Sequence, residues 1–490
     1  MDWSQVSNAP TFECIDTSIV LKVYGSLYLN LNMSFNFNGH LYFESLNLGN
    51  EILTSGQILD CPIDFNGFGG SWELLDALST TQLINLNCGS LNTKNHNITS
   101  AHFYATTNAP SNLELGTSTI TLTDPSSSWV IFDTLLNIDA DSSVIKLLGY
   151  YHPHFLHTQC QTRVNYNEVL FTSPTTNVVQ ESLIGNAYIR KIYFGSDGAL
   201  SGGTKVHVDS LIGNSYTIIE VRNSKINYLV SYDNFYLDNT FPVDSIMELR
   251  VYGDAFISSN ITLSINNNDF TQYFGNAVFE NNLNIYDSPS PQSGNHSIFS
   301  NCIIKGDGYF LSDSNYFDTL VFTIGRTYTF KSNTTQYIND WFDCFGAPGF
   351  PIQLVSDNIG QQATLNINQN IFCSDYLYIR DMIGTGSPNL YVGDNSNNVY
   401  NNSGWIFSDC HVSLNDVENS ASFSIYPNPT SGSLMVDNKD VRKIIIIDGQ
   451  GNLIKQTSCN FINISEQPNG IYFMKLYTDD RVLVKKVIKQ

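Results

Sequence analysis

Carboxylates are the first residues in this sequence that could do chemistry. Asp139 and Asp141 are two residues apart and would share one face of a strand, and Asp307 is a third candidate. Glycoside hydrolysis needs two carboxyl groups that face one sugar at about 5 to 9.5 Å. Ser142 and Ser143 follow directly, and they indicate a turn at Asp141. We therefore assign no catalytic residue among these carboxylates.

A second group contains residue types that bind metals. The run from His152 to Cys160 also holds His154 and His157, and zinc accepts imidazole and thiolate ligands. Pro153 disfavours a regular strand, and no carboxylate lies nearby to orient a ligand. A surface loop is the interpretation that we favour, and we assign no metal-binding residue.

Motifs of common enzyme classes are missing from the sequence. It has no His-Glu-x-x-His, no Gly-x-Ser-x-Gly and no Gly-x-x-x-x-Gly-Lys-Ser/Thr. Oxygen ligands for calcium are abundant, but no regular Asp-rich nonapeptide repeat appears, so calcium binding stays open. We expect no cofactor, and a non-enzymatic protein more than an enzyme.

Cysteine usage gives no metal or redox motif, because no Cys-x-x-Cys pair occurs. An odd number leaves at least one thiol free or paired outside the chain. Cys344 and Cys373 flank a compact segment and could form a disulfide, and the alternative is unpaired thiols buried between strands. The nine cysteines are Cys14, Cys61, Cys88, Cys160, Cys302, Cys344, Cys373, Cys410 and Cys459.

The elements that must position these residues are strands. Helical periodicity is almost absent, whereas short segments with alternating apolar and polar residues recur. Each such segment predicts a strand with one buried face. Examples are Gly25–Met33, Gln82–Asn87, Ser118–Thr123 and Asn260–Ile265.

Recurring phrases favour a coiled β-solenoid over a β-sandwich. Strands and turns alternate between Leu83 and Thr123, and about 400 residues are too many for one sandwich. The phrase Tyr166–Thr172 matches Phe317–Thr323 in its aromatic, apolar and Phe-Thr positions, as expected when each unit packs on its neighbours. The sequence thus predicts a parallel β-helix over about residues 20 to 407.

Asparagine clusters mark the predicted turns. Two examples are Asn92–Asn97 and Asn395–Asn402. Asn tolerates the left-handed conformation, and stacked Asn side chains can form hydrogen bonds between successive coils. Loose polar loops are the alternative.

Composition and charge limit the classes of partner. Aromatic residues make up 13% and charged residues 14%, which excludes disorder, and the net charge of −22 disfavours nucleic acid and anionic membranes. No run approaches 18 apolar residues, so we expect no transmembrane segment. The start lacks a basic and an apolar signal region, so we expect that the signal peptide is absent from this chain.

The last 80 residues differ from the rest in charge. The segment from His411 holds 9 Lys+Arg and 8 Asp+Glu of the chain's 23 and 45, which leaves 14 and 37 for the residues before it. We predict a passenger at 1–410, a polar linker at 411–422 and a small domain at 423–490. Turn residues in this small domain separate seven predicted strands, which indicate an immunoglobulin-like β-sandwich. These strands are expected at 423–426, 433–436, 442–447, 453–456, 460–464, 471–477 and 481–489.

The small domain resembles the type A sorting domain of the type IX secretion system, also called the Por system. The resemblance rests on Tyr426–Gly432, Asp448–Gly451, Gly470–Phe473 and Lys485–Lys489, which follow in the expected order. It implies recognition by the outer-membrane secretion apparatus, cleavage by a sortase-like protease, and anchoring or release of the passenger. The sorting-signal positions are Tyr426, Pro427, Asn428, Pro429, Gly432, Gly470, Tyr472, Lys485, Lys486 and Lys489. A domain that only caps the solenoid is the alternative.

The passenger is similar to β-helical repeat regions of large Bacteroidota surface proteins. The similarity rests on Gly69–Leu78, Ser118–Thr123 with Trp129, Asp375–Asp381 and Asn402–Phe407. We therefore expect a secreted or cell-surface protein that acts as an adhesin, a glycan-binding protein or a structural protein, with glycans or host and cell-surface molecules as ligands. A β-helical carbohydrate-active enzyme, a polysaccharide lyase or hydrolase, is the alternative.

Overall fold

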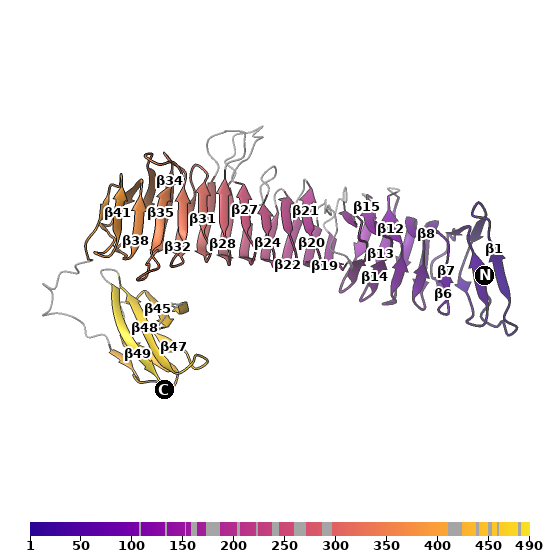
Figure 1. Cartoon of the computed structure of the whole chain (residues 1–490). Coiled ribbons are helices and arrows are strands. Elements are labelled where there is room, and N and C mark those ends of the chain that lie inside the picture. Colours follow the sequence, from indigo (N-terminus) through magenta and orange to yellow (C-terminus); the bar gives the residue numbers. More distant parts are fainter. Residues whose placement is uncertain are drawn as a thin grey trace.

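The structure, a computed structural model, is built from strands that form an elongated solenoid and a small separate sandwich (Figure 1). The solenoid extends from β1 (Thr11–Cys14) to β42 (Trp405–Ile406), and the sandwich from β43 (Ser424–Tyr426) to β49 (Val482–Lys489). The structure describes residues 1–490 except 107–108, 133–134, 152, 158–163, 173–186, 203–205, 222–223, 238–244, 259–270, 287–295, 410–423, 438–440, 449–452, 458–459 and 479–481.

Three long sheets form the walls of the solenoid, and the strand pairs that the structure describes there are parallel. The 16-stranded sheet contains β7 (Ile58–Leu59), β9 (Leu78–Thr80), β11 (Ile98–Ser100), β14 (Thr119–Leu122), β17 (Val144–Leu147), β19 (Val164–Phe171), β20 (Ala187–Phe194), β22 (Val206–Gly213), β24 (Lys225–Ser231), β26 (Ser245–Val251), β28 (Thr271–Phe279), β30 (His296–Ile304), β32 (Tyr316–Phe322), β34 (Thr335–Asp343), β36 (Ala363–Ile367) and β39 (Met382–Gly386). The 10-stranded sheet contains β21 (Gly198–Gly202), β23 (Thr217–Val221), β25 (Phe235–Leu237), β27 (Ala255–Ser258), β29 (Leu283–Tyr286), β31 (Gly308–Leu311), β33 (Thr327–Phe330), β35 (Ile352–Ser356), β38 (Leu377–Arg380) and β41 (Asn397–Tyr400).

The third long sheet belongs to the N-terminal half, and two short sheets complete the solenoid. The 11-stranded sheet contains β2 (Val20–Val23), β3 (Leu27–Tyr28), β5 (His40–Phe43), β6 (Asn50–Leu53), β8 (Ile63–Leu74), β10 (Leu83–Asn92), β12 (His102–Ala105), β13 (Ser111–Glu114), β15 (Ser128–Ile131), β16 (Leu136–Asp139) and β18 (His154–His157). The short sheets pair β1 with β4 (Ser34–Phe37), and β37 (Phe372–Cys373) with β40 (Leu390–Tyr391) and β42. The predicted parallel β-helix is confirmed.

The repeated phrases occupy equivalent places in the 16-stranded sheet. Register pairs lead coil by coil from Tyr166 in β19 to Phe317 in β32. Both side chains are buried, and so are Val169 and Leu320, three residues further along each strand. The similarity of the two phrases therefore reflects one position of the coil.

Columns of apolar side chains fill the interior between the sheets. Phe274, Phe299 and Phe317 lie on successive coils and stack with ring centroids 4.6 and 5.1 Å apart. Each buried ring stabilises the fold by about 1.5 to 3 kcal/mol relative to exposure. Because parallel pairing places like positions above one another, stacking of like residues follows from the register.

The predicted strands can be compared with those observed. Gln82–Asn87 lies largely within β10, and Ser118–Thr123 contains β14. Only Leu27–Tyr28 of the segment Gly25–Met33 is a strand, because residues 30–33 form a turn in which the N–H of Met33 donates to the carbonyl of Asn30 at 3.1 Å. Asn260–Ile265 lies outside the described residues.

A column of polar side chains holds one corner of the coils. The side chain of Asn234 accepts a hydrogen bond from the N–H of Asp254 at 2.7 Å, and Asp254 accepts one from the N–H of Asn282 at 3.3 Å. The side chain of Asn282 accepts from the N–H of Asp307 at 2.9 Å, and Asp307 accepts from the N–H of Thr327 at 2.8 Å. At each turn an Asn or Asp side chain therefore accepts a hydrogen bond from a backbone N–H of the next coil. The strand pairing of the sheets does not supply an acceptor for this N–H.

The two predicted asparagine clusters form the same kind of contact. In the first cluster, Asn97 Oδ1 accepts a hydrogen bond from the N–H of Thr119, one coil further on, at 2.9 Å. In the second, Asn402 Oδ1 accepts from the N–H of Met382 at 2.9 Å. Hydrogen bonding between coils is thus confirmed in both clusters.

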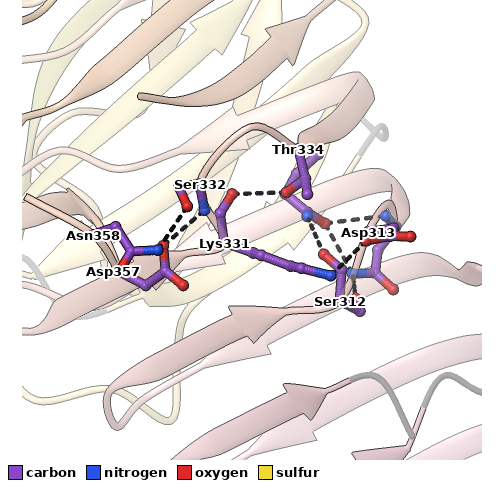
Figure 2. A network of polar contacts seen from close by, with 9 residues as sticks. Ser312, Asp313, Lys331, Ser332, Thr334, Asp357 and Asn358 are labelled. Atoms are coloured by element: carbon purple, nitrogen blue, oxygen red, sulfur yellow. Dashed lines mark hydrogen bonds and ion pairs between the residues drawn. The ribbon is translucent and has the colours of Figure 1, made fainter. Parts of the chain in front are cut away.

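A second corner is held by a network of charged and polar side chains (Figure 2). Asp357 Oδ1 accepts a hydrogen bond from the N–H of Ser332 at 2.7 Å, and Asn358 Nδ2 donates to the Ser332 hydroxyl at 2.9 Å. Lys331 Nζ reaches Asp313 Oδ1 of the preceding coil at 2.5 Å. Some carboxylates of this acidic chain therefore link neighbouring coils through hydrogen bonds and ion pairs.

The cysteines differ from one of the two predicted arrangements. Cys373 is disulfide-bonded, whereas Cys344 is a free buried thiol 3.7 Å from the Ser374 hydroxyl. The pairing of Cys344 with Cys373 is therefore wrong. Cys61 and Cys302 are free and buried as well, as small apolar residues often are.

The C-terminal sandwich has the seven predicted strands, each within two residues of its expected bounds. One sheet has the order β43, β44 (Ser433–Asp437), β47 (Phe461–Asn463), and the other β46 (Leu453–Thr457), β45 (Lys443–Asp448), β48 (Gly470–Tyr477), β49. All pairs are antiparallel, and the two sheets enclose an apolar core of their own. The immunoglobulin-like sandwich is confirmed. In the described part of the chain, no helix is long and apolar enough to cross a membrane.

The corner column yields a stability prediction. We expect Asp307→Ala to lower the free energy of unfolding by about 1 to 3 kcal/mol, because the N–H of Thr327 loses its acceptor. Asp307→Asn keeps an acceptor oxygen and should change it by less than about 0.5 kcal/mol. The measurement is urea unfolding followed by circular dichroism, with Asp318→Ala, an exposed carboxylate in β32, as the control. Equal effects of Asp307→Ala and Asp318→Ala would contradict the role of the column.

Candidate functional site

Two segments of the C-terminal sandwich that are far apart in sequence lie side by side. The turn after β43 runs along the outer edge of β49, the last strand of its sheet, and Thr430 and Lys489 form a parallel bridge there. The Pro-rich motif and the basic C-terminal segment, which lie far apart in the sequence, are therefore one structural unit.

Asn428 joins the two segments through both ends of its carboxamide. Its Nδ2 donates to the carbonyl of Lys486 at 2.7 Å, and its Oδ1 accepts from the N–H of Ile488 at 2.9 Å. Pro427 and Pro429 on either side have no N–H, so their backbone cannot donate to the edge of β49. The Asn428 side chain thus forms the two hydrogen bonds with β49, one as donor and one as acceptor, that the backbone of a neighbouring strand would otherwise form.

Thr430 continues the contact and was not among the predicted sorting residues. Its N–H donates to the carbonyl of Ile488 at 2.8 Å, and its carbonyl accepts from the N–H of Gln490 at 2.9 Å. Its hydroxyl donates to the carbonyl of Ser433 at 2.8 Å and accepts from the N–H of Gly432 at 3.0 Å. The signal that could have identified it is its place directly after Pro-Asn-Pro.

Gly432 ends the turn where no other residue fits. Its φ is 139°, and an added Cβ would lie 2.5 Å from Cα of Ser465. Its carbonyl accepts a hydrogen bond from the N–H of Ile464 at 2.7 Å. Gly432 thus allows the turn to approach the backbone beside β47.

The three lysines of the C-terminal segment have different environments. Lys485 and Lys486 are exposed, whereas Lys489 is buried and its Nζ donates to Asn469 Oδ1 at 3.2 Å. Lys489 therefore belongs to the framework of the domain, whereas Lys485 and Lys486 lie at its surface. Lys489 pairs in register with Gly470, and this contact closes the end of the sheet.

The two predicted tyrosines also separate into different places. Tyr472 is buried in the core of the sandwich, and its hydroxyl donates to the carbonyl of Pro468 at 2.6 Å. Tyr426 is 47% exposed, with its hydroxyl 3.2 Å from the sulfur of Met435. The structure therefore joins Asn428, Gly432, Gly470 and Lys489 in the framework and leaves Tyr426 at the surface.

The site has the properties of a recognition surface. From Lys486 onward the outer edge of β49 is occupied by residues 428–430, which leaves few backbone groups for pairing with another strand. The side chains of Lys485 and Lys486 are exposed where this closed edge begins, and they point to opposite faces of the sheet. A partner can bind such a surface through its side chains and its shape, and not through backbone pairing with a further strand.

The candidate carboxylates of the passenger have structural surroundings. Asp139 ends β16 and accepts a hydrogen bond from the N–H of Asp141 at 3.3 Å, and Asp141 lies in a turn with φ 35°, as predicted from the serines that follow. Asp307 belongs to the corner column described above. These carboxylates do not share a strand face.

The histidine run differs from the surface loop that we expected. His154–His157 is the strand β18, which pairs in parallel with β15, and Phe155 stacks on Trp129 at 6.3 Å. His152 and Cys160 lie outside the described residues. Among the residues that are described, no group of three His, Cys, Asp or Glu is arranged to hold a metal ion.

Fold and site define a class: a β-solenoid passenger followed by an immunoglobulin-like sandwich with a closed basic edge. Residues 424–490 match the family model described as the secretion system C-terminal sorting domain. The tail is therefore a sorting domain of the type IX secretion type, and it indicates a protein that is secreted or located at the cell surface. No curated protein matches the chain.

The Asn428 contact can be tested directly. Asn428→Ala should destabilise the sorting domain by about 1 to 2 kcal/mol, because two hydrogen bonds to β49 are lost. The amide of Ile488 should then exchange with deuterium about tenfold faster, as measured by NMR or mass spectrometry. Asn428→Asp retains the acceptor for this amide and should protect it better than Asn428→Ala. Unchanged exchange in Asn428→Ala would show that β49 does not depend on this side chain.

Proposed function

We propose that the chain is exported by the type IX secretion apparatus and that its passenger acts outside the cell as a non-enzymatic binding or structural protein. The match of residues 424–490 to the sorting domain carries this proposal. The closed edge formed by Asn428 and β49, with Lys485 and Lys486 exposed, is the surface that the apparatus recognises. A sortase-like protease then removes the domain, and the passenger is anchored or released.

Deletion of Lys485–Gln490 should block export across the outer membrane while the passenger stays folded. The deletion removes both the exposed lysines and the partners of Asn428 and Thr430. Localisation by cell fractionation in a host with type IX secretion measures the effect, and folded passenger should accumulate in the periplasm.

A double variant separates recognition from folding. Lys485→Glu with Lys486→Glu reverses two exposed charges and leaves the Asn428 contacts in place, so export should fall several-fold at unchanged thermal stability. Lys225→Glu, an exposed lysine of the passenger, is the matched control. Undiminished surface display of the double variant would show that recognition lies elsewhere.

An exposed aromatic pair favours glycan binding as the role of the passenger. Tyr232 and Tyr252 follow β24 and β26 on adjacent coils, and their rings stack with centroids 5.2 Å apart. They are 54% and 40% exposed, so a stacked pair of rings on neighbouring coils faces the solvent. Such rings offer flat apolar area together with a hydroxyl group.

Charged groups adjoin these tyrosines. The guanidinium of Arg250 lies 5.0 Å from the centre of the Tyr252 ring, and it is paired with Glu280. Lys305 Nζ lies 2.8 Å from the other oxygen of Glu280. Hydrogen-bonding groups beside stacked rings suit a ligand with hydroxyl groups above an apolar face, and glycans have both.

A glycan array with the full chain tests this role. Tyr232→Ala and Tyr252→Ala should each weaken binding about tenfold or more, whereas Tyr309→Ala, an exposed tyrosine of the 10-stranded sheet, should not. Equal binding by all variants would contradict the tyrosine platform and favour adhesion to a protein or a structural layer. Cleavage of a polysaccharide that is abolished by one Asp→Asn change would instead support the alternative function, a carbohydrate-active enzyme.

A further inference from the structure

One sheet of the sorting domain is buried on the face that points away from its own core. In β45, Ile444 and Ile446 belong to the core of the sandwich, and Ile445 between them must point outward. Ile445 is nevertheless only 4% exposed, and Tyr477 at the end of β48 is 7% exposed, although neither belongs to that core. Another part of the molecule therefore covers this outer face.

The cover is the passenger, at the end of strand β34. The ring of Trp341 meets the ring of Tyr477 edge to face, with centroids 4.3 Å apart. Lys443 Nζ of the sorting domain lies 4.6 Å from the centre of the same Trp341 ring. Edge-to-face rings and a cation over an indole are both attractive arrangements.

Opposite charges frame this contact. Asp340 and Asp343 lie on either side of Trp341 in the passenger strand, and on the sorting domain Lys443 begins β45 and Arg442 directly precedes it. Burial lowers the pKa of Lys443, and the two aspartates partly oppose this effect. The ammonium group is thus taken out of water against an acidic surface.

A second contact extends the interface along the outer face of the 16-stranded sheet. Lys475 Nζ lies 5.2 Å from the ring of Phe345. Beside it, a recess of about 600 Å³ is lined by Ile303 and Val321 of the passenger and by Ile447 of the sorting domain. Half-buried apolar side chains on the outside of the solenoid are thus matched by the isoleucines of β45.

The interface leaves Lys485 and Lys486 exposed, and it lies away from the Gly470 end of the domain. Tyr477 and Gly470 are the two ends of β48, and Gly470 pairs with Lys489. At about 3.4 Å per residue these ends are roughly 24 Å apart. Figure 1 accordingly shows the C-terminus at the end of the sandwich remote from the solenoid.

We propose that the passenger carries a docking site for its own sorting domain, formed by Asp340, Trp341, Asp343 and Phe345. It binds the outer face of β45 and β48 and holds the closed basic edge outward. Because the contacts are noncovalent and lie outside residues 411–422, they retain the sorting domain on the passenger after the chain between them is cut. Passenger and sorting domain then separate at a rate set by this interface.

The test uses the full chain with a specific protease site in place of residues 411–422. After complete cleavage at micromolar concentration, the two fragments should elute together in gel filtration at low salt. Trp341→Ala should weaken the association tenfold or more, and the fragments should separate. Tyr400→Ala, an exposed aromatic residue on another sheet of the passenger, is the matched control. Separation of the unaltered fragments under these conditions overturns the proposal.

A variant on the other side of the interface guards against misfolding of the passenger. Lys443→Glu places a carboxylate beside Asp340 and Asp343, and it should weaken the association tenfold or more without touching the passenger. Circular dichroism of each cut product shows whether both parts stay folded. Co-elution that neither Trp341→Ala nor Lys443→Glu weakens would show that the fragments associate through a different surface, and it would overturn the proposed site.

Discussion

Parallel pairing of each coil with the next is the constraint on which the rest of this structure depends. Register links Tyr166 to Phe317 through successive strands of one sheet, so each position of the coil becomes a column of neighbours. A column works only if its members suit one another, which explains the stacked Phe274, Phe299 and Phe317 inside. The same constraint acts at the corners, where the sheet ladder ends and a backbone N–H needs another acceptor. Asn and Asp side chains fill that need, and much of the polar composition of the chain follows from it.

This constraint also changes the role that is inferred for an acidic residue of the passenger. A carboxylate such as Asp307 attracts attention in a sequence because solenoid enzymes use acids, but in the fold it accepts the N–H of Thr327. Its column alternates Asn and Asp, and both residue types offer an oxygen at the same distance from the backbone. Acids that were selected as acceptors between coils add to the negative charge of the passenger without forming a catalytic pair. The charge then acquires a second consequence, because an acidic passenger attracts the basic face of its sorting domain.

Much of the fold could be predicted from the sequence, because local signals and repetition both survive in it. The seven strands of the sorting domain follow from turn residues and alternation, and the solenoid follows from a phrase that returns at Tyr166 and Phe317. What could not be predicted depends on partners far away in the sequence. Cys373 does not pair with Cys344. No local feature of the sequence shows that Lys489 is buried against Asn469, or that Thr430 pairs with β49.

The run of four isoleucines at 444–447 did contain a signal of burial on both faces, since a strand with one exposed face would alternate apolar and polar residues. Its second buried face is the one that meets the passenger.

The closed edge of β49 bears on what the secretion apparatus can read. An open edge strand is bound most simply by another strand, which pairs with its backbone. Here Asn428 and Thr430 already occupy the backbone groups at the end of β49. The Pro-Asn-Pro turn, the glycine that ends it and the terminal lysines are therefore parts of one folded unit, although 58 residues separate Asn428 from Lys486. A receptor for this surface must recognise side chains in a fixed arrangement, and that arrangement exists only when the sandwich is folded. If the apparatus recognises this surface, as we propose, the sorting signal is a folded domain, and its short motifs include residues that hold the edge of β49 closed.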